Sequence, residues 1–257
     1  MWDKGRHFLL QRLFLSLTAV CCMLPLLFLL LGSLRWEGSV SLAQYEEVLL
    51  YTRQFFIWFW NAVYSTAMIL LIHLPVSVLA GYAFSQFSFP GKRPLFFLYL
   101  ILMLLPFQAT VVPQYLTLNA LSLLDTRWAV ILPNAVSAFG AFLMAQYMMG
   151  IDPEIIQAAR LDGVGSLGLL WRVILPLCRP AVVSLAVLQF FSCWSLIDQP
   201  LLFLRREELL PLSLELTSQT FGASAMAAGV IYAVPPILAY LYCQRALEQG
   251  ICLSSYK

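Results

Sequence analysis

The chain has 257 residues, of which 61% are hydrophobic and only 11% are charged, and its mean hydropathy is +0.83. Soluble domains are about half apolar and about a quarter charged, so this composition excludes an ordinary soluble protein and indicates a polytopic membrane protein. The formal net charge of +2 gives no general case for nucleic-acid binding. The six cysteines form no CxxC pair and lie in no His-rich segment, so neither a metal site nor a disulfide framework is predicted.

A membrane helix needs about 20 mainly apolar residues, because each residue advances about 1.5 Å through about 30 Å of hydrocarbon. Stretches of this kind predict an all-α fold with six transmembrane helices, since helices satisfy their own backbone groups in lipid. They cover residues 13–31, 58–84, 95–112, 128–149, 180–197 and 223–242. The first is interpreted as an uncleaved anchor, because its apolar run exceeds that of a signal peptide. Prolines at positions 25, 75, 106, 133, 235 and 236 are expected to interrupt or kink these helices.

The orientation follows from the basic residues in alternate loops. With these six spans, ten Lys and Arg residues fall on one face of the membrane and five on the other. The more basic face is expected to be cytoplasmic, which places both termini in the cytoplasm of a multi-pass protein of the cell (inner or plasma) membrane.

The polar segment between the fourth and fifth spans predicts a short helix on the cytoplasmic face. Asp152 can cap it, Pro153 and Glu154 suit its first turn, and Gly163 can end it. A helix of about ten residues is too short to span the membrane. A second helical run is expected over residues 167–175. The first helix could pack passively under the bundle, or it could dock in a groove on a soluble partner.

This segment resembles the coupling loop of importer permeases in the ATP-binding cassette (ABC) superfamily. The family pattern is Glu-Ala-Ala, three residues, Gly, nine residues, Ile, one residue and Leu-Pro. Its positions fall, with every spacing kept, on Gln157, Ala158, Ala159, Gly163, Val173, Leu175 and Pro176. Gln157 replaces the Glu and Val173 replaces the Ile, and the run Ala159-Arg160-x-Asp162-Gly163 matches a form common among sugar importers. The resemblance therefore implies an ATPase-coupling site formed by Glu154, Gln157, Ala158, Ala159, Arg160, Asp162, Gly163, Leu175 and Pro176.

Further stretches extend the resemblance over residues 61–250. Those at 87–93, 103–106, 112–115, 131–133 and 137–140 are similar to the corresponding loops and spans of carbohydrate permeases. The chain thus resembles the MalG-type permease subunit of carbohydrate ABC importers. This implies an importer transmembrane domain over residues 57–250, an anchor helix and extracytoplasmic loop over 1–56, and a cytoplasmic tail over 251–257.

The resemblance also implies partners: an ABC ATPase dimer, a second homologous permease subunit, an extracytoplasmic substrate-binding protein and the surrounding membrane lipid, but no nucleic acid. The chain has no GxxxxGK[ST] phosphate loop, so we expect it not to be an enzyme. It is expected to hold no cofactor, with ATP and Mg bound on the partner ATPase. The solute is expected to be a sugar, an oligosaccharide or a polyol.

Polar side chains within the spans are candidates for the translocation path, because such groups are costly in lipid. Gln189, Ser192 and Trp194 fall within one and a half turns of the fifth span, and Asn134 lies in the fourth. Amide and aromatic groups suit a sugar through hydrogen bonds and ring stacking. Helix–helix hydrogen bonding is their alternative role. No catalytic residue and no metal ligand is predicted.

Three other classes compete with the importer interpretation. An ion-coupled transporter usually carries an ionisable residue at the membrane midplane, and the six spans contain no Asp, Glu, Lys or Arg. An intramembrane enzyme would need a nucleophile–base pair or metal ligands at that depth. A membrane scaffold protein is not excluded by composition. A permease of the same class for a non-sugar solute also stays open, because Trp194-Ser195-Leu196-Ile197-Asp198 departs from the Trp-Asn-Asp/Glu common in sugar permeases.

Overall fold

The computed structural model describes residues 2–36, 38–218 and 220–252. Residues 253–257, which hold most of the tail expected at 251–257, lie outside the described residues. The chain divides into two compact units, one of Met1–Ile57 with Glu215–Val234 and one of Trp58–Leu214 with Pro235–Lys257. Nearly all elements are helices, as expected for an all-α membrane protein.

Four helical stretches in the described residues are long and apolar enough to cross a membrane: Arg12–Ser33, Arg53–Gln86, Arg127–Met149 and Gly222–Gln244. Two further pairs of helices meet this test only together, because each pair is bent at a short break. They are Lys92–Met103 with Phe107–Ala120, bent by 104°, and Ser166–Leu177 with Arg179–Trp194, bent by 76°. The count is therefore four spans, or up to six if each bent pair is one span. A polytopic helical membrane protein is confirmed, and the number six stays a prediction.

The structure divides the third predicted span. Helix α4 (Lys92–Met103) ends before Pro106, which is extended with φ −67° and ψ 147°, and α5 (Phe107–Ala120) begins after it. Proline disfavours a helical conformation in the residue before it, which explains the break. The prolines at 25, 75, 133, 235 and 236 lie inside helices that continue past them, so these five do not interrupt a helix, and a kink at each of them stays a prediction.

The first unit contains the long α1 and a short hairpin. Its elements are α1 (Trp2–Ser33), β1 (Arg35–Trp36), β2 (Ser39–Val40), α2 (Ala43–Glu46), η1 (Glu47–Tyr51), η4 (Gly222–Ser224) and the beginnings of α3 (Arg53–Gln86) and α14 (Ala225–Cys252). The two strands pair antiparallel, with Arg35 opposite Val40. The buried Gln44 amide donates to the carbonyl oxygens of Gly32 at 2.9 Å and Arg35 at 2.6 Å, which satisfies the end of α1.

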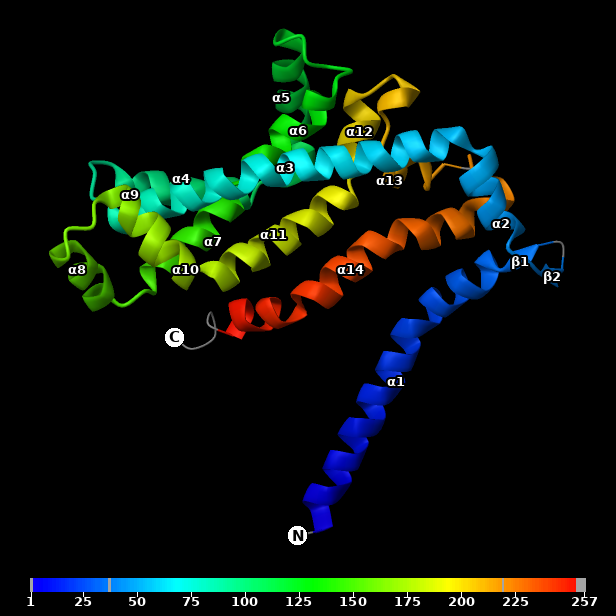
Figure 1. Cartoon of the computed structure of the whole chain (residues 1–257), viewed down its shortest axis with the longest axis horizontal. Coiled ribbons are helices and arrows are strands. Elements are labelled where there is room, and N and C mark those ends of the chain that lie inside the picture. Colours follow the sequence, from blue (N-terminus) through cyan, green and yellow to red (C-terminus); the bar gives the residue numbers. More distant parts are fainter. Residues whose placement is uncertain (1, 37, 219, 253–257) are drawn as a thin grey trace. The chain divides into compact units, whose positions relative to one another are not determined.

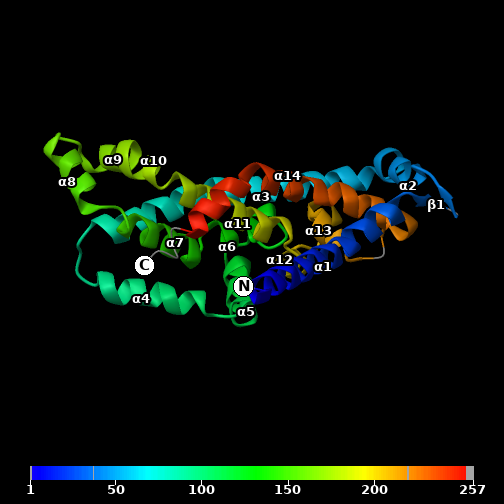
Figure 2. The same cartoon turned by 90° about the horizontal axis from the view of Figure 1, so that it is seen from below.

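The second unit holds the remaining helices, including the rest of α3 and α14. Those not yet given are α6 (Arg127–Ala135), α7 (Ala138–Met149), α8 (Pro153–Leu161), α9 (Ser166–Leu169), η2 (Leu170–Ile174), α10 (Leu175–Leu177), α11 (Arg179–Trp194), α12 (Asp198–Phe203), η3 (Glu207–Leu209) and α13 (Leu212–Glu215). Helix α7 packs against α4 and α11, and α12 packs against α6. In both views α8, α9 and α10 lie together at one end of this unit (Figures 1 and 2).

Helices α3 and α7 approach each other closely through two glycines. A Cβ atom on Gly81 would lie 2.5 Å from Cβ of Met144, and one on Gly140 would lie 2.2 Å from Oγ of Ser77. Small residues at such crossings let two membrane helices pack backbone to backbone. The position of the end of α3 against α7 is therefore tightly determined.

Candidate coupling loop and polar cluster

Helix α8 is capped as its sequence predicts. The Asp152 side chain accepts a hydrogen bond from the backbone N–H of Glu154 at 2.9 Å, and Pro153 occupies the first helical position. At the other end, Gly163 has φ +78°, a left-handed conformation that favours glycine, and its N–H donates to the Arg160 carbonyl at 3.1 Å. The structure therefore has a short helix here, of nine residues, which ends at Leu161, two residues before Gly163.

The two faces of α8 differ in what they contact. Ile156 is 8% exposed and packs, with the half-buried Ala159, against the main apolar core of the second unit. The opposite face carries Leu161, which is 89% exposed. Leu161 is not part of the predicted coupling site, whose exposed residues on or directly after this helix are Glu154, Gln157, Ala158, Arg160, Asp162 and Gly163. One face thus anchors the helix and the other is left open.

The rest of the loop runs back to the bundle through α9, η2 and α10. The second predicted helical run is present, but over Leu170–Ile174 it is a π-helix. Leu175 is half-buried against the same core, whereas Pro176 is exposed. The signature residues therefore divide into core-facing and exposed groups, a distinction that their spacing does not reveal.

The core beneath the loop joins it to the ends of three long helices. Its buried members include Val78 and Tyr82 of α3, Met144 and Met148 of α7, Ala181 and Leu185 of α11, and Ile156, Leu169, Leu170 and Ile174 of the loop. We call this set the loop core. The hydroxyl of Tyr82 also donates to the backbone carbonyl of Ser166 at 2.7 Å. The loop is therefore packed directly against α3, α7 and α11.

A second feature is a chain of amide side chains away from the loop. Asn134 of α6 donates to Oε1 of Gln199 of α12, and Gln199 donates to Oε1 of Gln114 of α5 at 3.3 Å. Gln189 of α11 donates to the backbone carbonyl of Asn134 at 3.3 Å. These four residues form the amide cluster. Gln114 also lines a mainly apolar cavity of about 520 Å³ between α5 and α6.

The structure brings together two of the four predicted path residues. Asn134 and Gln189 belong to the amide cluster, whereas Ser192 is exposed and donates to the Leu188 carbonyl of its own helix at 3.1 Å. Trp194 is 3% exposed, and its ring stacks on Phe190 with 5.6 Å between centroids. The sequence analysis missed Gln114 and Gln199 because both lie just beyond the ends of the predicted spans.

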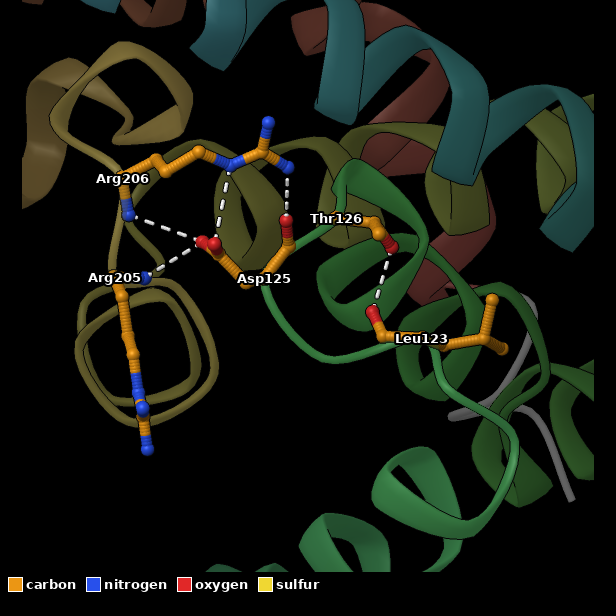
Figure 3. A network of polar contacts seen from close by, with 5 residues as sticks. All are labelled: Leu123, Asp125, Thr126, Arg205 and Arg206. Carbon is orange, nitrogen blue, oxygen red and sulfur yellow. Dashed lines mark hydrogen bonds and ion pairs between the residues drawn. The ribbon is translucent and has the colours of Figure 1, made fainter.

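A third feature is the carboxylate of Asp125, which binds the segment after α12. Asp125 has φ +57°, and its Oδ1 accepts the backbone N–H groups of Arg205 at 2.9 Å and Arg206 at 3.0 Å (Figure 3). Its Oδ2 accepts from Nε of Arg206 at 3.1 Å. The N–H groups of Arg205 and Arg206, together with the Arg206 guanidinium, lower the pKa of Asp125. The same figure shows the Thr126 hydroxyl turned to the Leu123 carbonyl, which it meets at 2.6 Å.

The beginning of α3 in the second unit contacts the same segment. Nε1 of Trp58 donates to the Glu207 carbonyl at 3.0 Å, and the Asn61 amide donates to the carbonyls of Glu208 at 2.7 Å and Leu210 at 3.2 Å. Residues 205–210 are therefore fixed by side chains from two distant parts of the sequence. Among the described residues, no group of three or more His, Cys, Asp or Glu could hold a metal ion.

Comparison of the chain with known proteins shows which family it belongs to. The model of the binding-protein-dependent transport system inner membrane component family matches residues 73–251, more than half of the chain. The arabinooligosaccharides transport system permease protein AraQ of Halalkalibacterium halodurans is 31% identical over 78% of this chain and 74% of its own length. AraQ of Bacillus subtilis is 27% identical over 95% of this chain and 94% of its own length. The sn-glycerol-3-phosphate transport system permease protein UgpE of Yersinia pestis is 30% identical over 69% of this chain and 66% of its own length.

A solved structure is similar over nearly the whole chain. It is a bacterial ABC transporter involved in the import of the acidic polysaccharide alginate, with a TM-score of 0.84 and 25% identity, and the match covers 92% of this chain and 95% of that one. The fold, the loop and the family match agree with one another. This chain belongs to the family of binding-protein-dependent transport system inner membrane components and is a permease subunit of an ABC importer.

Proposed function

We propose that this permease imports a sugar, an oligosaccharide or a polyol as half of a translocation path whose other half is a second, homologous permease subunit. The observation that carries this proposal is the similarity along nearly the whole chain to permeases named for arabino-oligosaccharides and to a transporter that imports alginate. The glycerol-3-phosphate permease among the relatives favours a phosphorylated polyol as the second candidate. ATP and Mg would be bound by a separate ATPase dimer.

The exposed face of α8 is the proposed docking site for that ATPase. An amphipathic helix that is anchored by one apolar face can place its other face in a groove on a partner. Leu161, Ala158 and Gln157 would enter the groove, because all three are exposed. Gln157 keeps hydrogen-bonding capacity but lacks the charge of the family's Glu. Glu154 is also exposed and lies one turn earlier on the helix, so its carboxylate can supply that charge.

In this proposal the chain crosses the membrane six times, with α4 and α5 together forming the third span, α11 forming the fifth, and both termini in the cytoplasm. The basic residues of the loop containing α8 support that orientation. Residues 205–210 would then lie outside, on the side of the substrate-binding protein. A solved alginate transporter of similar fold has been captured with an alginate pentasaccharide-bound periplasmic protein. The amide cluster would lie within the path, where its amide groups could replace water around solute hydroxyls.

The proposal is tested by purifying the chain from native membranes in mild detergent and identifying its partners by mass spectrometry. We expect an ABC ATPase and a second polytopic permease. The reconstituted complex should hydrolyse ATP faster when a cognate binding protein carries an arabino-oligosaccharide than when it is empty. Stimulation by glycerol-3-phosphate alone would shift the proposal to the second candidate. A chain that purifies without any ATPase would contradict the proposed function.

A further inference from the structure

The phenol of Tyr82 forms a direct link between α3 and the coupling loop. Tyr82 is 5% exposed, and its hydroxyl donates to the Ser166 carbonyl at 2.7 Å although 84 residues separate the two in sequence. Ser166 is the first residue of α9, and its carbonyl also accepts the N–H of Leu170 within that helix. The Tyr82 hydroxyl is therefore bonded to the backbone of the loop itself.

The close packing of α3 on its neighbours fixes the position of Tyr82. The preceding residue, Gly81, lies so close to α7 that a Cβ there would come within 2.8 Å of the backbone nitrogen of Ala145. The Tyr82 ring stands edge-on to Phe87, with centroids 5.4 Å apart and planes at 75°. A phenol fixed in this way presents its hydroxyl at one place, so the hydrogen bond sets where α9 lies.

The hydrogen bond differs in kind from the apolar contacts around it. Contacts among Ile156, Leu169 and Leu170 depend on apolar area and close packing and have no preferred direction. A hydrogen bond loses strength steeply with distance and angle. A buried hydroxyl that lost its acceptor would stay unsatisfied in apolar surroundings. Displacement of α9 therefore favours displacement of the end of α3 in the same direction.

Far from Tyr82, near Trp58, helix α3 is also joined to a loop. Trp58 and Asn61 donate to the carbonyls of Glu207, Glu208 and Leu210. Trp58 and Tyr82 lie on one helix, about 36 Å apart at about 1.5 Å per residue. In Figures 1 and 2, α8 to α10 lie at one end of α3, and α12 lies much farther along it.

We propose that Tyr82 is a positioning residue through which α3 carries movement between the α8–α9 loop and residues 207–210, which Trp58 and Asn61 hold at the other end. This inference rests on the proposed function, since it requires α8 to dock on the ATPase and residues 207–210 to face the binding protein. By linkage, binding on either side would bias the other. No residue of this route needs to touch the solute.

The test compares Tyr82→Phe with Tyr147→Phe in the reconstituted complex. Phenylalanine keeps the ring and removes only the hydroxyl. Tyr147 packs against the same loop core, and the described residues offer its hydroxyl no hydrogen bond, so it is a matched control. For Tyr82→Phe we expect normal assembly and basal ATP hydrolysis, with stimulation by solute-loaded binding protein reduced about two- to tenfold, as loss of one hydrogen bond implies. Tyr147→Phe should keep the wild-type stimulation.

A double-mutant cycle separates a shared route from general damage. Trp58→Phe removes the donor to Glu207, and if both residues act on one route, Tyr82→Phe combined with Trp58→Phe should be little worse than either alone. Equal stimulation of Tyr82→Phe and Tyr147→Phe, or additive losses in the double variant, would overturn the role of Tyr82. A wild-type complex that binding protein fails to stimulate would instead overturn the proposed function.

Discussion

The carboxylate of Asp125 accepts the backbone N–H of Arg205 at 2.9 Å, which joins the start of one membrane helix to a loop 80 residues away. The neighbouring N–H of Arg206 binds the same oxygen, and together with the Arg206 guanidinium these donors stabilise the ionised carboxylate. The bond is directed at backbone, so it holds the course of the chain at residues 205 and 206. Protonation of one side chain should therefore loosen this loop.

The first prediction concerns pH. Because the folded-state pKa of Asp125 is lowered, its contribution to loop stability is fully present above the ordinary carboxyl pKa of about 4 and is lost as pH falls through the lowered value. Hydrogen exchange at the amides of Arg205 and Arg206, corrected for intrinsic rates, should accelerate over that acidic window. Asp125→Asn cannot ionise, so its exchange should lack this pH dependence. Identical pH profiles for the two proteins would show that the carboxylate does not hold the loop.

The second prediction concerns the departure from the family at position 157. Gln157→Glu should bind the ATPase at least as well as the wild type, because it adds an ionised acceptor on the exposed face of α8. Glu154→Gln should weaken binding by about 1 kcal/mol, since it removes the carboxylate proposed to take that role. Co-purification with the ATPase at increasing salt measures both. If Gln157→Glu abolished the association, the assignment of this helix as the docking element would be wrong.

The third prediction concerns the cap of α8. Asp152→Ala removes the acceptor of the Glu154 N–H and should destabilise the helix by about 1 kcal/mol, whereas Asp152→Asn keeps an acceptor oxygen and should cost little. Because a frayed first turn would displace Glu154 and Gln157, the alanine variant should also bind the ATPase less well. Hydrogen exchange over residues 153–157 reports the helix directly. Equal exchange in the alanine and asparagine variants would argue against the cap.

The fourth prediction concerns the amide cluster. Gln199 is 5% exposed and bonds to both Asn134 and Gln114, so Gln199→Ala leaves two amides without their partner at a cost of about 1–3 kcal/mol. We expect a marked loss of solute uptake in Gln199→Ala and Gln189→Ala at normal membrane levels. Ser192→Ala is the matched control, because Ser192 is exposed and bonds only within α11 in the described structure. Unchanged uptake in both glutamine variants would remove the cluster from the path.

The local features of the coupling loop could be predicted because their causes lie within a few residues. An aspartate before Pro153 starts α8, and a glycine free to adopt φ +78° ends it. The family signature itself extends further, from α8 through the turn at Gly163 to α10. The spacing does not indicate which of these residues are buried. Ala159 and Leu175 face the loop core, and Ala158 and Pro176 do not.

Proline positions show a different limit of sequence reasoning. Pro106 divides α4 from α5, whereas Pro75 lies inside an unbroken α3. Proline disfavours a helical conformation in the residue before it, yet α3 continues past Pro75 while the helix before Pro106 ends. The same residue type therefore has two outcomes, which the flanking apolar residues do not distinguish.

By itself the sequence determined that the protein is a helical membrane protein with a short capped helix between two apolar segments, because hydrophobic length and capping are local properties. Only the tertiary structure decided which polar groups meet. The hydroxyl of Tyr82 reaches Ser166, and the amides of Gln114 and Gln199 join across α5 and α12, over separations of 84 and 85 residues. Each of these pairs forms because packed helices bring distant residues to one place, and neither member of a pair carries a local pattern that names its partner.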